Sequence, residues 1–343
     1  MPNLQDEMKR IKAKVDELIL TQLLPRGSAI KEVDLLYTMM RDYPSRQAKG
    51  MRPFLCVTGC RAAGGKEDDA ILTAACIELF QNWILVHDDI EDGSELRRGE
   101  PALHRKYDQA LALNAGDALH ARTWEALLKN RQRLGLPRTF AVMEEFSKMV
   151  NETTEGQHME LGWVVGKRWD LDEKDYYEMC AKKTSWYTVA SPCRLGAIVA
   201  GVGGPVLDDL REFGINLGIA FQIQDDSLNL VGDQRKYGKA KSDDILEGKR
   251  TLILLHLLTV ATQSERDKVI SIMNKTREAK SASDVAFVLS MIDRYDAVGF
   301  ARKRAVELMK EAVATLGGIR WEGDREASEM LTSFAHFAVE REW

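Results

Sequence analysis

Two groups of acidic residues, far apart in the chain, are the most informative chemical feature of the sequence. The first reads Asp-Asp-Ile-Glu-Asp over residues 88–92, and the second begins with the pair Asp225 and Asp226. Each group interrupts an apolar stretch that has the spacing of a helix. Carboxylates at the end of an apolar helix are unfavourable unless a cation is present. Basic residues lie near both groups, so the pattern indicates divalent metal ions that hold a polyphosphate.

In the first group, Asp88 and Asp92 stand four residues apart. On a helix they share one face, with Cβ atoms roughly 5–6 Å apart. Oxygen ligands of this kind suit Mg²⁺, which is commonly shared with substrate phosphates, and we include Asp89 among the metal ligands. Arg97 and Arg98 follow in a loop and offer the planar fork that grips phosphate. Taken alone, this group is also explained as an acidic helix end with local salt bridges.

In the second group, we expect Asp225 to be the principal metal ligand, with Asp226 in a supporting role. Asn229 lies one turn later and offers a neutral oxygen, which we place in an outer shell around the metal. Lys239 and Lys249 follow and supply positive charge near this group.

A further set of basic and polar residues fits an anion site. Lys49 and Arg52 lie three apart, just before an apolar helix, and a helix N-terminus is a favourable place for an anion. Gln81 lies two helical turns before the first acidic group, and Lys183 and Thr184 place a cation and a hydroxyl side by side. In isolation, each of these also fits a solvated loop or a half-buried polar residue.

The apolar pattern is helical almost throughout, and we find no convincing strand or hairpin signal. Glycine and proline residues fall between the helices, and no linker marks a domain boundary. We therefore predict a single all-α domain over residues 1–343, a bundle of helices around a deep central cavity. The predicted helical segments are residues 4–23, 66–92, 111–134, 139–161, 207–231, 249–261 and 285–316.

Residues 176–200 also have a helical pattern, although Pro192 lies inside it. Proline removes a backbone hydrogen bond and clashes with the preceding turn. Either the helix kinks near Thr188 and leaves a carbonyl free, or two helices meet at a break.

The composition of the 343-residue chain is that of an ordinary globular protein, with 45% hydrophobic and 29% charged residues. A net charge of −5 gives no general attraction to nucleic acid or anionic membranes. The five cysteines lack the spacing of a metal site, and we expect reduced thiols in a cytoplasmic protein. We expect neither a signal peptide nor a membrane span.

Together these segments resemble the trans-isoprenyl diphosphate synthases, the family of the farnesyl and geranylgeranyl diphosphate synthases. The similarity extends from about residue 49 to residue 251. One departure is Asn229, where the family usually has aspartate; another is Gln81, where many bacterial members have histidine. We expect activity to survive both, with weaker metal binding from the first. The segments that carry the resemblance are residues 49–53, 88–92 with 97–101, 183–184 with Lys239, 221–226 and 249–251.

The resemblance implies a trans-prenyltransferase that condenses isopentenyl diphosphate with an allylic diphosphate. It also implies a homodimer and three Mg²⁺ ions that bridge the two acidic groups through the allylic diphosphate. Arg97, Lys183 and Lys239 would bind the leaving diphosphate, and Thr184 and Gln222 would stabilise the allylic cation. The residues for isopentenyl diphosphate would be Lys49, Arg52, Gln81 and Arg98, and Lys249 also fits the substrate-binding pattern.

Product length in this family depends on side chains before the first acidic group. Trp83 lies five residues before Asp88 and Phe80 lies eight before it, while Ile84 is not aromatic. A bulky aromatic residue at the position of Trp83 resembles short-chain enzymes. We therefore favour a twenty-carbon product, geranylgeranyl diphosphate, over a fifteen-carbon one. The alternative is that Trp83 packs in the core or a dimer interface and does not set the length.

Two other functions remain open. A class I terpene cyclase also uses acidic helices and Mg²⁺, but it does not need the second diphosphate site that Lys49, Arg52 and Arg98 indicate. A non-catalytic subunit of a heteromeric synthase tends to lose its acidic motifs, whereas only Asn229 is altered here.

Overall fold

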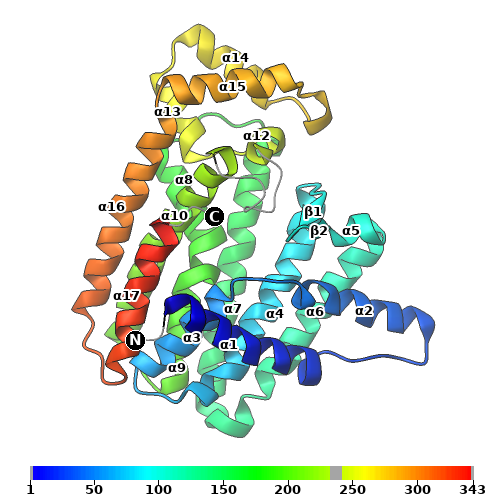
Figure 1. Cartoon of the computed structure of the whole chain (residues 1–343), viewed down its shortest axis with the longest axis vertical. Helices are drawn as coiled ribbons and strands as arrows, with labels where there is room; N and C mark the ends of the chain where they lie inside the picture. Colours follow the sequence, from blue (N-terminus) through cyan, green and yellow to red (C-terminus); the bar gives the residue numbers. More distant parts are fainter. Residues whose placement is uncertain (1–2, 232–241, 341–343) are drawn as a thin grey trace. The chain divides into compact units, whose positions relative to one another are not determined.

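The computed structural model describes residues 3–231 and 242–340, and these residues are helical almost throughout (Figure 1). The all-α prediction is therefore confirmed, although two short strands are present. Lys239 lies outside the described residues. In chain order the elements are α1 (Leu4–Leu18), the π-helix η1 (Ile19–Leu23), α2 (Lys31–Ser45), α3 (Met51–Ala62), α4 (Glu67–Glu91), β1 (Leu96–Arg97), β2 (Glu100–Pro101), α5 (Leu103–Lys106), α6 (Gln109–Leu128), α7 (Arg131–Val165), α8 (Glu173–Cys180), the π-helix η2 (Ala181–Ala190), α9 (Ser191–Ala200), α10 (Pro205–Val231), α12 (Asp243–Glu247), α13 (Leu252–Val260), α14 (Gln263–Met273), the 3₁₀-helix η3 (Arg277–Ala279), α15 (Ala282–Arg294), α16 (Ala297–Gly318) and α17 (Arg325–Glu340).

Contacts within the chain divide it into two compact units. Unit 1 comprises Met1–Lys148, Tyr187–Arg211 and Gly318–Phe334, and unit 2 comprises the remaining segments, Met149–Trp186, Glu212–Gly317 and Ala335–Trp343. The division falls within helices, so α7 and α10 contribute residues to both units. The single-domain assignment stays a prediction, and each unit is described by itself.

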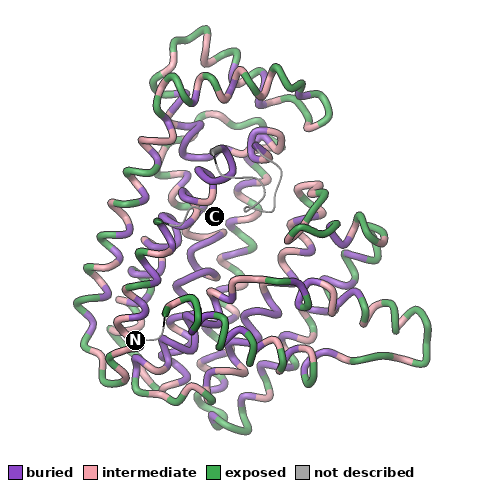
Figure 2. The backbone as a smooth tube through the Cα atoms, in the orientation of Figure 1, coloured by how far each residue is buried: buried purple, intermediate pink, exposed green. Residues whose placement is uncertain are grey.

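The core of unit 1 is built on α3 and α4. Helix α3 packs against α9 and α4, and α4 packs against α6. Helix α3 is buried almost throughout, and so is the middle of α4 over residues 73–80 (Figure 2). Helix α4 is long and apolar enough to cross a membrane by length and composition, contrary to our expectation that no segment would be. However, 67% of its most apolar window is buried inside the protein, as in the core helix of a globular fold.

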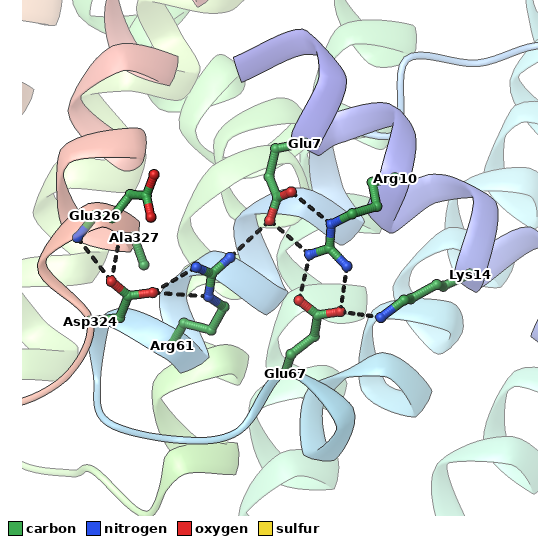
Figure 3. A network of polar contacts seen from close by, with 8 residues as sticks. All are labelled: Glu7, Arg10, Lys14, Arg61, Glu67, Asp324, Glu326 and Ala327. Carbon is green, nitrogen blue, oxygen red and sulfur yellow. Dashed lines mark hydrogen bonds and ion pairs between the residues drawn. The ribbon is translucent and has the colours of Figure 1, made fainter. Parts of the chain in front are cut away.

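Helix α1 is fastened to the start of α4 and the end of α3 by a network of ion pairs (Figure 3). Arg10 donates to Glu7 and, through Nη1, to Glu67 Oε1 at 2.8 Å. Arg61 Nη1 lies 2.8 Å from Glu7 Oε1, and its Nη2 lies 2.6 Å from Asp324, which caps α17. Glu7, Arg10 and Arg61 each have partners from two elements, and Glu67 accepts from two residues of α1, Arg10 and Lys14.

We expect the Glu67→Gln variant to unfold at a lower temperature than the wild type. Hydrogen bonds from Arg10 and Lys14, opposed by partial burial, lower the pKa of Glu67 to about 2. The stabilisation is therefore full above the unfolded carboxyl pKa near 4.3 and is lost as the pH falls toward 2. Because Arg10 is largely exposed, we expect only about 0.5–1 kcal/mol at pH 7, or a few degrees in Tm. Thermal unfolding at pH 7 and pH 3 measures this, with exposed Glu17→Gln as control; a difference that does not shrink in acid contradicts it.

Unit 2 contains the second half of α7, most of η2, α10 and α16, and the elements α8, α12, α13, α14 and α15. Helix α13 packs against α8, α14 and α15, and α12 packs against α15. The N-termini of α8, α14 and α15 each have a capping box, built by Asp172, Thr262 and Ser281. These caps satisfy backbone N–H groups that have no partner within the helix.

The predicted segments differ from the structure in several places, and they omit α2, α14 and α17. The expectation of no strand was wrong, because β1 and β2 pair as an antiparallel hairpin with a two-residue loop. The segment 111–134 contains all but the first two residues of α6 together with the start of α7, and the break expected after it is present as a kink at Gly135, which has φ 73°. The segment 285–316 contains α15 and α16, which separate at Tyr295 and Asp296; Asp296 has φ 48°, a left-handed conformation that ends the helical path.

The segment 176–200 is not one continuous α-helix. Helix α8 ends at Cys180, the π-helix η2 occupies Ala181–Ala190, and α9 begins at Ser191 with Pro192 at its second position. A proline in the first turn removes no hydrogen bond from its own helix. The backbone stays helical at both junctions, Ala181 and Ala190, so the structure shows neither alternative as stated. Helices α8 and α9 are joined through a π-helical segment, and the free carbonyl near Thr188 stays a prediction. Such π-helical insertions are frequent at functional sites.

Candidate active site

The first acidic group lies at the C-terminal end of α4 in unit 1. Asp88 is in its last turn, with 19% of the side chain exposed, and Asp92 is the C-cap residue. Asp89 is fully buried between them. Arg97 from β1 joins two of these carboxylates: its Nε lies 2.8 Å from Asp89 Oδ1 and its Nη2 lies 3.0 Å from Asp88 Oδ2. Burial acts against the charged guanidinium, but Asp89 and Asp88 outweigh it and raise the pKa of Arg97. Arg97 therefore fixes the carboxylates as well as offering a cation.

Tyr43 of α2 supports this group, and the sequence did not reveal it. Its hydroxyl donates to Asp89 Oδ2 and accepts from the backbone N–H of Leu103 at 3.0 Å. Burial, followed by the charge of Asp89, raises the pKa of Tyr43, so the phenol stays a donor. Arg46 of the same helix stacks on the Tyr43 ring and donates to the carbonyl of Arg97 at 2.7 Å. Helix α2 thus holds both Asp89 and the strand that carries Arg97.

We expect Tyr43→Phe to lower kcat by about 10-fold while the protein remains folded. Loss of the hydroxyl leaves a buried carboxylate and a buried N–H with fewer partners, which costs about 1–3 kcal/mol of stability. Residues that orient metal-binding groups typically cost 10–100-fold when removed. Steady-state kinetics at saturating Mg²⁺ measures the effect, and half-exposed Tyr37→Phe on the same helix is the control. Equal rates for the two variants would contradict the role of Tyr43.

Arg98 and Gly99 form the turn of the β1–β2 hairpin. Both have positive φ, 55° and 80°, as the commonest two-residue hairpin turn requires. The turn directs Arg98 inward, where its Nη1 donates to the carbonyl of Tyr43 at 2.9 Å. Burial lowers the pKa of Arg98. The side chain is therefore a poorly hydrated cation, which binds an anion more strongly than a solvated one does.

Arg52 lies in the first turn of α3 and is also buried. Its Nη2 donates to Thr188 Oγ1 at 2.9 Å, and its guanidinium lies 4.2 Å from the centre of the Tyr187 ring. Its Nε is buried without a hydrogen-bond partner among the described residues. Lys49 and Gln81 are half-buried, at the approach to α3 and on α4. A buried donor without a partner, such as Nε of Arg52, is unfavourable unless a ligand accepts its hydrogen bond.

The predicted chain-length residues belong to an aromatic cluster in unit 1. Phe80 is fully buried and Trp83 is 8% exposed, and their rings meet edge to face at 5.3 Å. Trp83 stacks on His120 of α6 at 4.1 Å, and Trp124 Nε1 donates to His120 Nε2 at 2.7 Å. Ile84 is half-buried on α4. The sequence did not identify the two α6 residues, which hold the Trp83 ring in one orientation.

In unit 2, a chain of hydrogen bonds joins the second acidic group to η2. Thr184 Oγ1 donates to Gln222 Oε1 at 2.7 Å, and Gln222 Nε2 donates to Asp226 Oδ1 at 2.8 Å. Tyr176 donates to the other oxygen of Asp226 at 2.7 Å. Burial raises the pKa of Asp226 to about 6, although the bonds from Gln222 and Tyr176 oppose that shift. Asp225 on the same turn is half-buried. Asp226 is thus placed to support its neighbour.

Two glycines allow the neighbouring helices α7 and α10 to approach η2 closely. A Cβ at Gly156 of α7 would lie 2.1 Å from the backbone nitrogen of Lys183, and one at Gly218 of α10 would lie 2.4 Å from Ser185. Only glycine permits approaches this close. Lys183 then forms an ion pair with Glu160 of α7.

The remaining residues of the second group have structural partners. Asn229 is buried, and its Oδ1 accepts from the backbone N–H of Asp244 at 3.2 Å in the first turn of α12. Lys249 Nζ lies 2.7 Å from Glu247 Oε2. The amide of Asn229 therefore organises the start of α12, which a carboxylate oxygen could do equally well.

The acidic side chains fit a magnesium site that is completed by substrate. Within residues 3–231 and 242–340, no three His, Cys, Asp or Glu side chains gather closely enough to hold a metal on their own. Mg²⁺ is usually held by one or two carboxylates together with substrate phosphates and water, so a closed protein cage is not needed. The half-buried Asp88 and Asp92 of unit 1 suit such ligation, and so, taken by itself, does the half-buried Asp225 of unit 2.

The sequence profile of the polyprenyl synthetase family matches residues 33–292. A short-chain isoprenyl diphosphate synthase from Methanothermobacter thermautotrophicus is 34% identical over 86% of each chain. The chain belongs to the polyprenyl synthetase family. Other relatives, each 32% identical, are named geranylgeranyl diphosphate synthase in Saccharolobus solfataricus (85% of this chain and 86% of that protein) and geranylfarnesyl diphosphate synthase in Natronomonas pharaonis (81% and 77%).

Solved structures of polyprenyl synthetases agree with this fold. Geranylgeranyl pyrophosphate synthetase from Pyrococcus horikoshii is 33% identical, with a TM-score of 0.85 over 98% of this chain and 99% of that one. Geranylgeranyl pyrophosphate synthase from Corynebacterium glutamicum, complexed with isoprenyl diphosphate and magnesium, is 25% identical, with a TM-score of 0.89 over 99% of both chains. The predictions of the family, the all-α fold and a prenyltransferase are confirmed. The five cysteines are free and buried.

Proposed function

We propose that this polyprenyl synthetase condenses isopentenyl diphosphate with an allylic diphosphate and yields geranylgeranyl diphosphate. The observation that carries the proposal is the pairing of Arg97 with both Asp88 and Asp89 at the end of α4. It presents Asp88 in a fixed position while leaving it partly exposed. A solvated acidic helix end would not need a buried arginine and the buried hydroxyl of Tyr43.

In this proposal Asp88, Asp92 and Asp225 would hold Mg²⁺, three ions in all. Asp89, which we also expected among the ligands, and Asp226 would support them, because their oxygens already accept hydrogen bonds from Arg97 and Tyr43 and from Gln222 and Tyr176. Bound Mg²⁺ would supply Lewis-acid neutralisation of the charge that develops on the leaving diphosphate. Arg97, Lys183 and Lys239 bind diphosphate oxygens. Lys183 would exchange Glu160 for phosphate, so Glu160 keeps the ammonium in place before substrate binds.

The reaction breaks the allylic carbon–oxygen bond and forms a carbon–carbon bond with the double bond of isopentenyl diphosphate. The hydroxyl of Thr184 and the amide of Gln222 direct dipoles at the allylic cation, and their mutual hydrogen bond keeps them oriented. The last proton passes to the departing diphosphate, so no protein base is required. Lys49, Arg52, Gln81 and Arg98 hold isopentenyl diphosphate, and Lys249 assists substrate binding.

Two features of the molecule bear on product and assembly. The stacked Trp83 and His120 support a short product, with Phe80 and Ile84 beside them on α4; fifteen carbons is the alternative. Exposed Leu128, Leu136 and Phe140 on α6 and the start of α7 support a homodimer. We also keep a cytoplasmic location as part of the proposal.

The test is incorporation of labelled isopentenyl diphosphate into an acid-labile prenyl diphosphate. We expect incorporation only when an allylic diphosphate and Mg²⁺ are both present, and none after chelation with EDTA. Hydrocarbon formed without isopentenyl diphosphate would favour a terpene cyclase instead. No product from any allylic substrate would favour a non-catalytic subunit.

A further inference from the structure

Helix α1 contacts Gly50, which lies between Lys49 and Arg52 in the sequence. Gly50 is the N-cap of α3, with φ 67°, a left-handed conformation that other residues rarely adopt. A Cβ at Gly50 would lie 2.7 Å from Cβ, 3.1 Å from Cγ and 3.0 Å from Cδ of Lys12. The methylene groups of Lys12 therefore lie directly on the Gly50 backbone.

Lys12 is an unusual lysine because its side chain is only 11% exposed. Its ammonium forms an ion pair with Asp16, one turn later on α1. The charge is thus neutralised within α1, and the stem is what contacts Gly50. This geometry favours a packing role for Lys12 over a role as a diphosphate ligand.

Helix α1 is held in place by contacts on two sides. Its apolar face, with Met8, Ile11 and Val15, is buried against α3 and α4. The ion pairs of Arg10 and Glu7 fasten its outer side (Figure 3). The family profile begins at residue 33, so α1 lies outside the matched segment. Helix α1, which lies outside the matched segment, therefore contacts Gly50.

We propose that Lys12 is a positioning residue for isopentenyl diphosphate, a role that rests on the proposed function. Its stem holds Gly50 in the left-handed conformation, so that Lys49 on one side and Arg52 on the other keep their spacing. A small displacement of a substrate-positioning group can change rates by about 100-fold. No residue assigned to the allylic diphosphate neighbours Gly50 in sequence. We therefore expect a change at Lys12 to affect the binding of isopentenyl diphosphate alone.

The test compares Lys12→Ala, which removes the stem, with Lys12→Met, which keeps a similar stem and removes the charge. We expect Lys12→Ala to raise the KM for isopentenyl diphosphate about 10-fold, with kcat and the KM for the allylic diphosphate within about twofold of wild type. Lys12→Met should restore the KM to near the wild-type value. Exposed Lys9→Ala on the same helix is the control, and thermal unfolding verifies that each variant is folded. If Lys12→Ala does not fold, Lys12→Val, which keeps Cβ and Cγ atoms but lacks Cδ and Cε, takes its place.

Three results would overturn the inference. They are an unchanged KM in Lys12→Ala, equal losses for both substrates, or a Lys12→Met variant as impaired as Lys12→Ala, which would assign the role to the charge. None of these three results concerns condensation by the wild-type protein, so the proposed function would stand. A wild-type protein that does not condense the two substrates would instead remove both proposals.

Discussion

Asp88→Asn should lower kcat by on the order of 10³-fold or more while leaving the protein folded. The substitution removes a negatively charged oxygen ligand and leaves the shape of the side chain. Arg97 keeps Asp89 as partner, so the buried guanidinium remains neutralised. Asp225→Asn should have a comparable effect from the second acidic group.

Single-turnover kinetics with saturating substrates and a range of Mg²⁺ concentrations measure this effect. The exposed Glu95→Gln on the adjoining loop is the control and should turn over like wild type. Thermal unfolding should place all three variants within a few degrees of each other. Wild-type-like turnover in Asp88→Asn, at any Mg²⁺ concentration, would refute the assignment of the first acidic group.

Trp83→Ala should shift the product toward longer chains by one or more isoprene units. The indole is among the largest side chains of the aromatic cluster, and its removal leaves space beside His120 and Phe80. Trp83→Phe keeps an aromatic ring and should keep the short product, which makes it the matched control.

Loss of a buried tryptophan typically costs about 3–5 kcal/mol, so Trp83→Leu provides a better-filled variant with the same expected direction. Chromatography of the dephosphorylated alcohols gives the product distribution, and unfolding curves give the stability separately. If Trp83→Ala and Trp83→Leu are less stable but make the wild-type product, then Trp83 is a core residue and does not set the length.

Local patterns in the sequence were enough to place the acidic groups. Asp88 and Asp92 end a helix because the apolar spacing of α4 extends to them, and Gln222 and Asp226 share a face of α10 at a spacing of four. Tyr43 could not be found in this way. It contacts Asp89 from 46 residues away in sequence, and its helix α2 contains Pro44 near its end.

The irregular backbone was missed for a related reason. Apolar periodicity detects α-helical spacing, whereas η2 follows a π-helical path. The hairpin turn at Arg98 and Gly99 lacks the Asn-Gly or Asp-Gly dipeptide that usually marks such turns. Lys183 was selected from the sequence, but its ion pair with Glu160 could not be, because that pair depends on Gly156 allowing α7 to approach η2.

Mass spectrometry of the product made from dimethylallyl diphosphate, isopentenyl diphosphate and Mg²⁺ tests the central claim most directly. We expect a twenty-carbon prenyl diphosphate that forms only when both substrates and the metal are present. A hydrocarbon released from the allylic diphosphate alone, or no product with any allylic substrate, would contradict it.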